Sequence, residues 1–165
     1  MKMTEEELYI KNDRLMYTKN KASSNLAILA ILFDVFYFVS IYKSDVGNYY
    51  YNILIGASIV YNLLFMLAAF LSSEGAKNYK IVYSWVLIVI GVLQIVRIFI
   101  LPMRAHSALV SIAGVETIAM GNAQFTRIVI YLVVSAVCLV AAGIINFRKC
   151  TAIQAHQQKL EAAKA

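Results

Sequence analysis

Apolar residues occupy four long stretches of this chain, and most charged residues are concentrated between them. A helix of about 20 apolar residues, rising about 1.5 Å per residue, is long enough to cross a hydrocarbon core of roughly 30 Å. The stretches are apolar on every side, whereas the helices of a soluble bundle carry one apolar stripe. The pattern predicts an all-α integral membrane protein with four transmembrane helices in a bundle, at about residues 25–42, 51–71, 81–101 and 125–147.

Basic residues are distributed unevenly over the gaps between these stretches. Eleven of the fifteen Lys and Arg residues lie before the first span, between the second and third, or after the fourth. Because basic residues are enriched on the cytoplasmic side of a membrane, this bias predicts a multi-pass protein of the cytoplasmic membrane with both termini inside. The same bias accounts for the net charge of +6 without a nucleic-acid partner, so the expected partner of these residues is the lipid bilayer.

Composition and the terminal segments define three regions. With 61% hydrophobic and 15% charged residues, the chain is too apolar for an ordinary soluble domain. In the N-terminal segment Thr4 and Glu7 have the spacing of a helix capping box, and Ser23, Ser24 and Asn25 are expected to break or cap the start of the first span. The C-terminal segment is rich in helix-forming Ala, Gln and Lys and is expected to extend the fourth span. The predicted regions are a cytoplasmic amphipathic segment (1–24), a membrane domain (25–147) and a short cytoplasmic helical tail (148–165).

Asp34, Asn62, Gln94 and Arg97 are polar residues inside the predicted spans, where an ionised side chain costs a few kcal/mol. Asp34 is near the middle of the first span, and Asn62 lies at a similar depth on the second. Gln94 on the third span is about one turn farther out, and Arg97 follows it on the same face. We expect these residues to form an intramembrane polar cluster, although about 10 Å of depth separates Arg97 from Asp34 in straight, upright helices.

The sequence permits two interpretations of this cluster. In the first, Asp34, Asn62 and Gln94 form hydrogen bonds between helices and fix their order, while Arg97 extends to the outer headgroups. In the second, Asp34 exchanges a proton for a cation within a cleft, as acids do inside secondary transporters. The first interpretation predicts an accessory or structural subunit of a larger membrane assembly. The second predicts a small secondary transporter that works as a homo-oligomer.

The connection 102–124 is too long for a turn between packed helices and too apolar for an ordinary exposed loop. Ala108, Ile112 and Val115 follow helical spacing, which predicts an interfacial or re-entrant helix near 108–120. Such a helix would either cover the outer end of the bundle or dock another membrane or surface protein. The candidate interaction residues at this outer surface are Arg104, His106, Glu116 and Arg127.

No group of residues in the sequence indicates catalysis or a bound metal. His106 has no second His or carboxylate that completes a metal-ligand set, and no Ser or Cys is paired with a base. Cys138 and Cys150 are about 18 Å apart along a helix, so they cannot form a disulfide with each other. We therefore expect a non-enzymatic protein without catalytic residues, metal or cofactor, whose partner is another membrane protein or a second copy of itself.

Overall fold

The computed structural model describes residues 4–41, 49–107, 109–112, 115–118 and 120–163, and helices account for nearly all of this part of the chain. Four of the described helices are long and apolar enough to cross a membrane, which confirms the predicted helical class and the number of candidate spans. They are α2 (Lys21–Ile41), α3 (Tyr49–Lys77), α4 (Ile81–Ile100) and α6 (Asn122–Ala162). Their length and composition are those of a multi-pass membrane protein.

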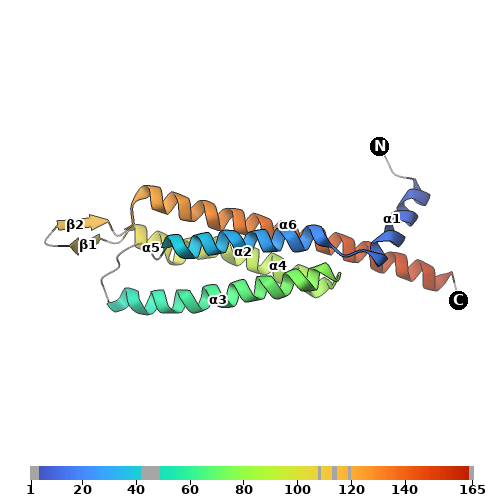
Figure 1. Cartoon of the computed structure of the whole chain (residues 1–165), viewed down its shortest axis with the longest axis horizontal. Coiled ribbons are helices and arrows are strands. Elements are labelled where there is room, and N and C mark those ends of the chain that lie inside the picture. Colours follow the sequence, from blue (N-terminus) through green and yellow to red (C-terminus); the bar gives the residue numbers. More distant parts are fainter. Residues whose placement is uncertain (1–3, 42–48, 108, 113–114, 119, 164–165) are drawn as a thin grey trace.

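The four long helices lie lengthwise beside one another as a bundle (Figure 1). The two chain termini lie at one end, which we call the terminal end, and a short hairpin extends from the other, which we call the hairpin end (Figure 1). Three of the helices are longer than predicted, among them α2, which begins four residues before its predicted start. α3 continues to Lys77, and α6 runs without a break into the C-terminal segment, so the predicted helical tail is a continuation of the fourth long helix.

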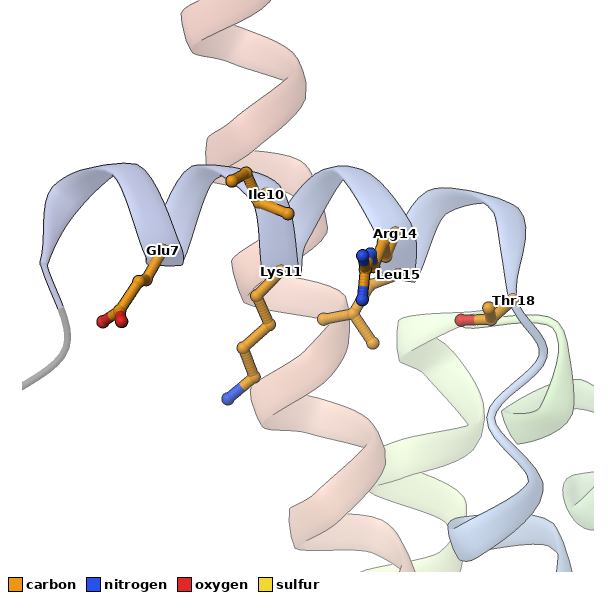
Figure 2. A pocket seen from close by; sticks show the side chains of 6 residues that line it. All are labelled: Glu7, Ile10, Lys11, Arg14, Leu15 and Thr18. Carbon is orange, nitrogen blue, oxygen red and sulfur yellow. The ribbon is translucent and has the colours of Figure 1, made fainter.

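A short helix, α1 (Glu5–Tyr17), precedes the bundle. Its first turn has the predicted capping box, because the Glu7 N–H donates to Thr4 Oγ1 at 3.4 Å and the Thr4 N–H donates to the Glu7 carboxylate at 3.0 Å. α1 crosses α6 at the terminal end of the bundle (Figure 2). The Tyr9 ring meets the His156 ring edge-on there, with 4.8 Å between centroids.

Helix α2 begins at Lys21, so the expected break at Ser23, Ser24 and Asn25 is wrong. The two serines are buried and form hydrogen bonds with neighbouring helices. Ser23 Oγ donates to the Ala142 carbonyl at 2.7 Å, and Ser24 Oγ lies 2.9 Å from Ser73 Oγ. A hydroxyl that finds its partner on another helix does not compete for the backbone of its own, so the helix continues through these residues.

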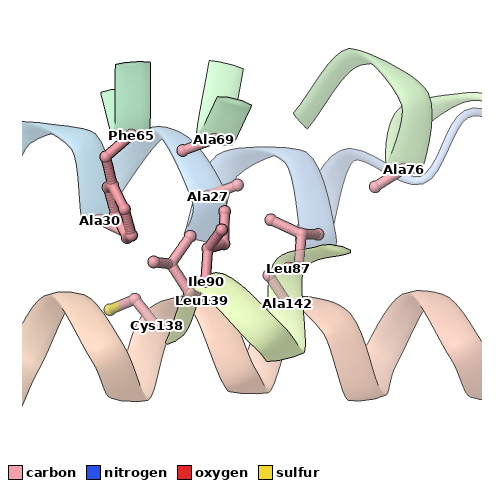
Figure 3. Packing of buried hydrophobic residues seen from close by; sticks show 10 residues of the cluster. All are labelled: Ala27, Ala30, Phe65, Ala69, Ala76, Leu87, Ile90, Cys138, Leu139 and Ala142. Carbon is pink, nitrogen blue, oxygen red and sulfur yellow. The ribbon is translucent and has the colours of Figure 1, made fainter. Parts of the chain in front are cut away.

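Small side chains bring the long helices together in the half of the bundle nearer the terminal end (Figure 3). Because Ala presents only a methyl group, helix backbones can approach closely where it lines the interface. The larger Leu87 and Leu139 fill the remaining space between α4 and α6. This core consists of Ala27, Ala30, Phe65, Ala69, Ala76, Leu87, Ile90, Cys138, Leu139 and Ala142.

The surface of the bundle is apolar, and polar side chains lie inside it. Large exposed apolar patches are rare on soluble proteins, whereas an apolar surface suits a hydrocarbon solvent. Buried polar residues include Asp34, Gln94 and Asn146. Exposed apolar residues occur on each long helix, among them Leu32 and Val39 on α2, Leu63 and Phe70 on α3, Val82 and Phe99 on α4, and Ile130 and Val137 on α6.

The predicted helix near 108–120 is wrong. Pro102 begins the short helix α5 (Pro102–Ser107), which is followed by the antiparallel strands β1 (Leu109–Ile112) and β2 (Val115–Ile118). Residues 108, 113, 114 and 119 of the predicted helix lie outside the described residues. The segment is rich in β-branched Val, Ile and Thr, which favour strands, and this preference outweighs the helical spacing of its apolar residues.

Candidate functional site

Three of the four residues predicted to form the intramembrane cluster are in contact. Asp34 on α2 is 1% exposed, and Gln94 and Arg97 on α4 are 0% and 4% exposed. Gln94 Nε2 donates a hydrogen bond to Asp34 Oδ1 at 2.6 Å, and Arg97 Nη1 lies 3.6 Å from the same oxygen. Arg97 Nη1 also donates to Gln94 Oε1 at 3.4 Å. The buried Asp34 carboxylate is therefore in contact with both the Gln94 amide and the Arg97 guanidinium.

The amide of Gln94 links three helices. Besides Asp34 on α2, its Nε2 reaches Ser135 Oγ on α6 at 3.2 Å. Ser135 Oγ in turn donates to the Ala30 carbonyl of α2 at 3.1 Å. Hydrogen bonds that join three helices at one depth fix both the rotation and the height of each helix relative to the others.

Arg97 is buried, so the expectation that it extends to the outer headgroups is wrong. Its guanidinium carbon lies 4.1 Å from the centroid of the Tyr37 ring and 5.4 Å from that of the Tyr61 ring. Ring faces and a carboxylate attract a cation, and together they offset the loss of its hydration. The long side chain of Arg97 also spans the depth that separates it from Asp34.

Asn62 lies outside this cluster. It is buried on α3, but neither Nδ2 nor Oδ1 of its side chain has a hydrogen-bond partner among the described residues. An amide buried without hydrogen-bond partners costs free energy, and no described residue offsets that cost for Asn62.

A hollow between α3 and α4 lies next to the cluster. Its volume is about 190 Å³, and its walls are mostly apolar. Arg97 borders the hollow, and the Nη2 atom of this residue is buried without a hydrogen-bond partner among the described residues. We call this feature the α3/α4 hollow; it is lined by Ala57, Ser58, Tyr61, Arg97, Ile100 and Leu101.

A second buried polar cluster, near the terminal end, was not predicted from the sequence. Asn146 on α6 accepts a hydrogen bond from Asn20 Nδ2 at 3.0 Å and donates to Ser84 Oγ on α4 at 2.8 Å. Lys149 Nζ donates to Asn20 Oδ1 at 2.9 Å. The available signal was Asn146 itself, a polar residue inside the fourth predicted span. Its partners are Ser84, near the start of the third predicted span, and Asn20, which precedes the first.

The four outer candidates do not form one site among the described residues. Arg104 on α5 and Arg127 on α6 are exposed. His106 stacks on the Phe125 ring at 4.5 Å, and its Nδ1 lies 3.0 Å from the Met120 carbonyl oxygen, so its contacts are those of a packing residue. Glu116 is in β2, where its backbone is opposite Ser111, and its side chain is outside the described part.

Neither local chemistry nor likeness to other proteins identifies an activity. Within the described ranges no three His, Cys, Asp or Glu side chains are close enough together to hold a metal ion. Comparisons with protein-family models, with curated proteins and with solved structures found no match to this chain. A function is therefore inferred from the two polar clusters and the α3/α4 hollow.

Proposed function

We propose that the protein is a non-enzymatic accessory subunit of a larger assembly in the cytoplasmic membrane. The observation that supports this function is the α3/α4 hollow, where a buried guanidinium retains an N–H without a partner among the described residues. In a hydrocarbon solvent such a donor requires an acceptor from protein. A transmembrane helix of another protein, with a polar side chain or an accessible carbonyl at this depth, would fill the hollow, and a small rotation of the buried guanidinium would let that group accept from Arg97 Nη2.

The orientation proposed for the subunit places both termini in the cytoplasm. Both termini are at the same end of the bundle (Figure 1). Most exposed basic residues lie toward that end. At the hairpin end, α5 and the start of α6 carry the exposed basic residues Arg104 and Arg127. The positive-inside rule then assigns the terminal end to the cytoplasm and the hairpin end to the outside.

The geometry of Asp34 gives less support to the alternative, a homo-oligomeric secondary transporter. A coupling acid must be reached by water and by the transported cation. Asp34 instead has Gln94 hydrogen-bonded to its Oδ1 and the guanidinium of Arg97 beside the same oxygen. A cation arriving at this carboxylate would have to displace Arg97, which is itself buried. The contacts are those of a group that holds helices together.

Filling the hollow is expected to detach the partner. Ser58→Trp places an indole among the lining residues, so a partner helix can no longer reach Arg97. We expect a tagged Ser58→Trp chain, extracted from its native membrane in a mild detergent, to lose a co-purifying protein that the unmodified chain retains in a fixed ratio. The measurement is the molar mass and composition of the extracted particle.

Leu63→Trp is the matched control, because Leu63 is 54% exposed on a different face of α3. It should leave the particle unchanged. If the unmodified chain is extracted only as a monomer or homo-oligomer, the accessory function is wrong. Equal loss of the partner from both tryptophan variants would place the contact elsewhere on α3.

A further inference from the structure

A second hollow lies along one side of α1. Its volume is about 350 Å³, and its walls are contributed by α1 and the residue that follows it. Two of the lining side chains are basic, Lys11 and Arg14, and two are apolar, Ile10 and Leu15. The hollow thus combines two cationic donors with an apolar floor. Its remaining lining residues are Glu7 and Thr18.

The orientation of α1 turns this hollow toward the bundle. Figure 2 shows Lys11 and Leu15 extending from α1 on the side where the bundle helices lie, with α6 crossing behind. With the bundle in a bilayer, α1 would lie along the cytoplasmic surface of the membrane, and these side chains would point at the headgroups. Basic groups above an apolar floor are the pattern of a helix that rests on an anionic membrane surface.

The charges around the hollow favour an anion. Glu7 is its one acidic lining residue, and the Glu7 carboxylate accepts a hydrogen bond from the Thr4 N–H, at the helix N-terminus where the dipole favours negative charge. Lys11 and Arg14 are exposed and free to approach a ligand from one side. Lys149 of α6 donates to Asn20, three residues past the end of α1, and adds a positive charge near that end of the helix.

We propose that this hollow binds the headgroup of an anionic phospholipid of the cytoplasmic leaflet. Lys11 and Arg14 hold the phosphate through charge-assisted hydrogen bonds, and Ile10 and Leu15 contact the upper part of the acyl chains. The site rests on the proposed membrane insertion but needs no partner subunit. Its failure would therefore leave the α3/α4 hollow and the accessory function unaffected.

Native mass spectrometry of the full chain in detergent tests the site, with phosphatidylglycerol and phosphatidylcholine as probes. We expect selective retention of phosphatidylglycerol. Because a basic residue near an anionic surface changes affinity by about fivefold, Lys11→Gln/Arg14→Gln should weaken this binding by roughly 25-fold. Lys11→Arg/Arg14→Lys keeps both charges and should retain the lipid. Lys159→Gln, which removes an exposed charge beside a different hollow, is the control that should leave binding unchanged.

Three results would overturn the site. Equal retention of both lipids would remove the role of headgroup charge. Unchanged binding by Lys11→Gln/Arg14→Gln would place the lipid elsewhere on the chain. Displacement of phosphatidylglycerol by millimolar inorganic phosphate would show a site for free anions instead of a lipid.

Discussion

Replacing Arg97 with Met is expected to lower the free energy of unfolding by about 3 to 5 kcal/mol. The change removes the cation 3.6 Å from Asp34 Oδ1 and leaves a carboxylate that is 1% exposed, with the Gln94 amide as its remaining partner among the described residues. A buried charge without its counter-charge is among the most costly defects in a folded protein. The measurement is equilibrium unfolding of the purified chain in mixed micelles of increasing dodecyl sulfate content.

Two further variants test whether the loss of stability is specific to the Asp34–Arg97 ion pair. Asp34→Leu/Arg97→Met removes both charges and should recover most of the lost stability, because apolar residues of similar size can replace a buried ion pair. Arg127→Met removes an exposed Arg from α6 and should change stability by no more than about 0.5 kcal/mol. Stability of Arg97→Met equal to that of Arg127→Met would mean that the pair does not hold the bundle together.

Gly143→Ala is expected to destabilise the bundle by about 1 to 3 kcal/mol. A Cβ at this position on α6 would lie 2.8 Å from the Ser84 carbonyl oxygen and 3.3 Å from the Ile88 nitrogen, both backbone atoms of α4. Backbone atoms cannot move to another rotamer as a side chain can. The two helices must therefore separate and lose packing along their shared interface. The same unfolding titration measures the loss.

Gly56→Ala provides the comparison on α3, because nothing lies within 4 Å of the Cβ that it would add. Alanine stabilises a helix relative to glycine, so this variant should be as stable as the parent or slightly more so. If Gly143→Ala were also neutral, the close approach of α4 and α6 would not contribute to stability.

The sequence was sufficient to predict the long helices, because each span must satisfy its backbone internally and must reach across the hydrocarbon. Their ends were less predictable. The start of α2 includes Ser23, whose hydroxyl looks like a helix breaker until its acceptor on Ala142 is known. The hairpin shows a different limit. Its apolar residues fit both a helical and a strand period, and only the β-branched composition distinguished the two.

The sequence identified three members of the buried cluster, Asp34, Gln94 and Arg97, but it wrongly included Asn62, and it gave only part of the geometry. Depth along each span follows from residue counts, and this placed Asp34, Asn62 and Gln94 at similar levels. Counting residues along a span does not give the rotation of a helix about its own axis. This rotation brings Gln94 into contact with Asp34 and leaves Asn62 without a hydrogen bond to either residue. The burial of Arg97 depends on Tyr37 and Tyr61, two rings on different helices whose convergence the sequence does not reveal.

The most direct test of the accessory role is electron cryomicroscopy of the tagged chain, extracted from its native membrane into polymer nanodiscs without detergent. We expect a helix of an unrelated protein against Ser58 and Tyr61, with an acceptor within hydrogen-bond distance of Arg97 Nη2. A particle that contains only copies of this chain, with lipid in the α3/α4 hollow and a water path to Asp34, would contradict the accessory role and favour the transporter.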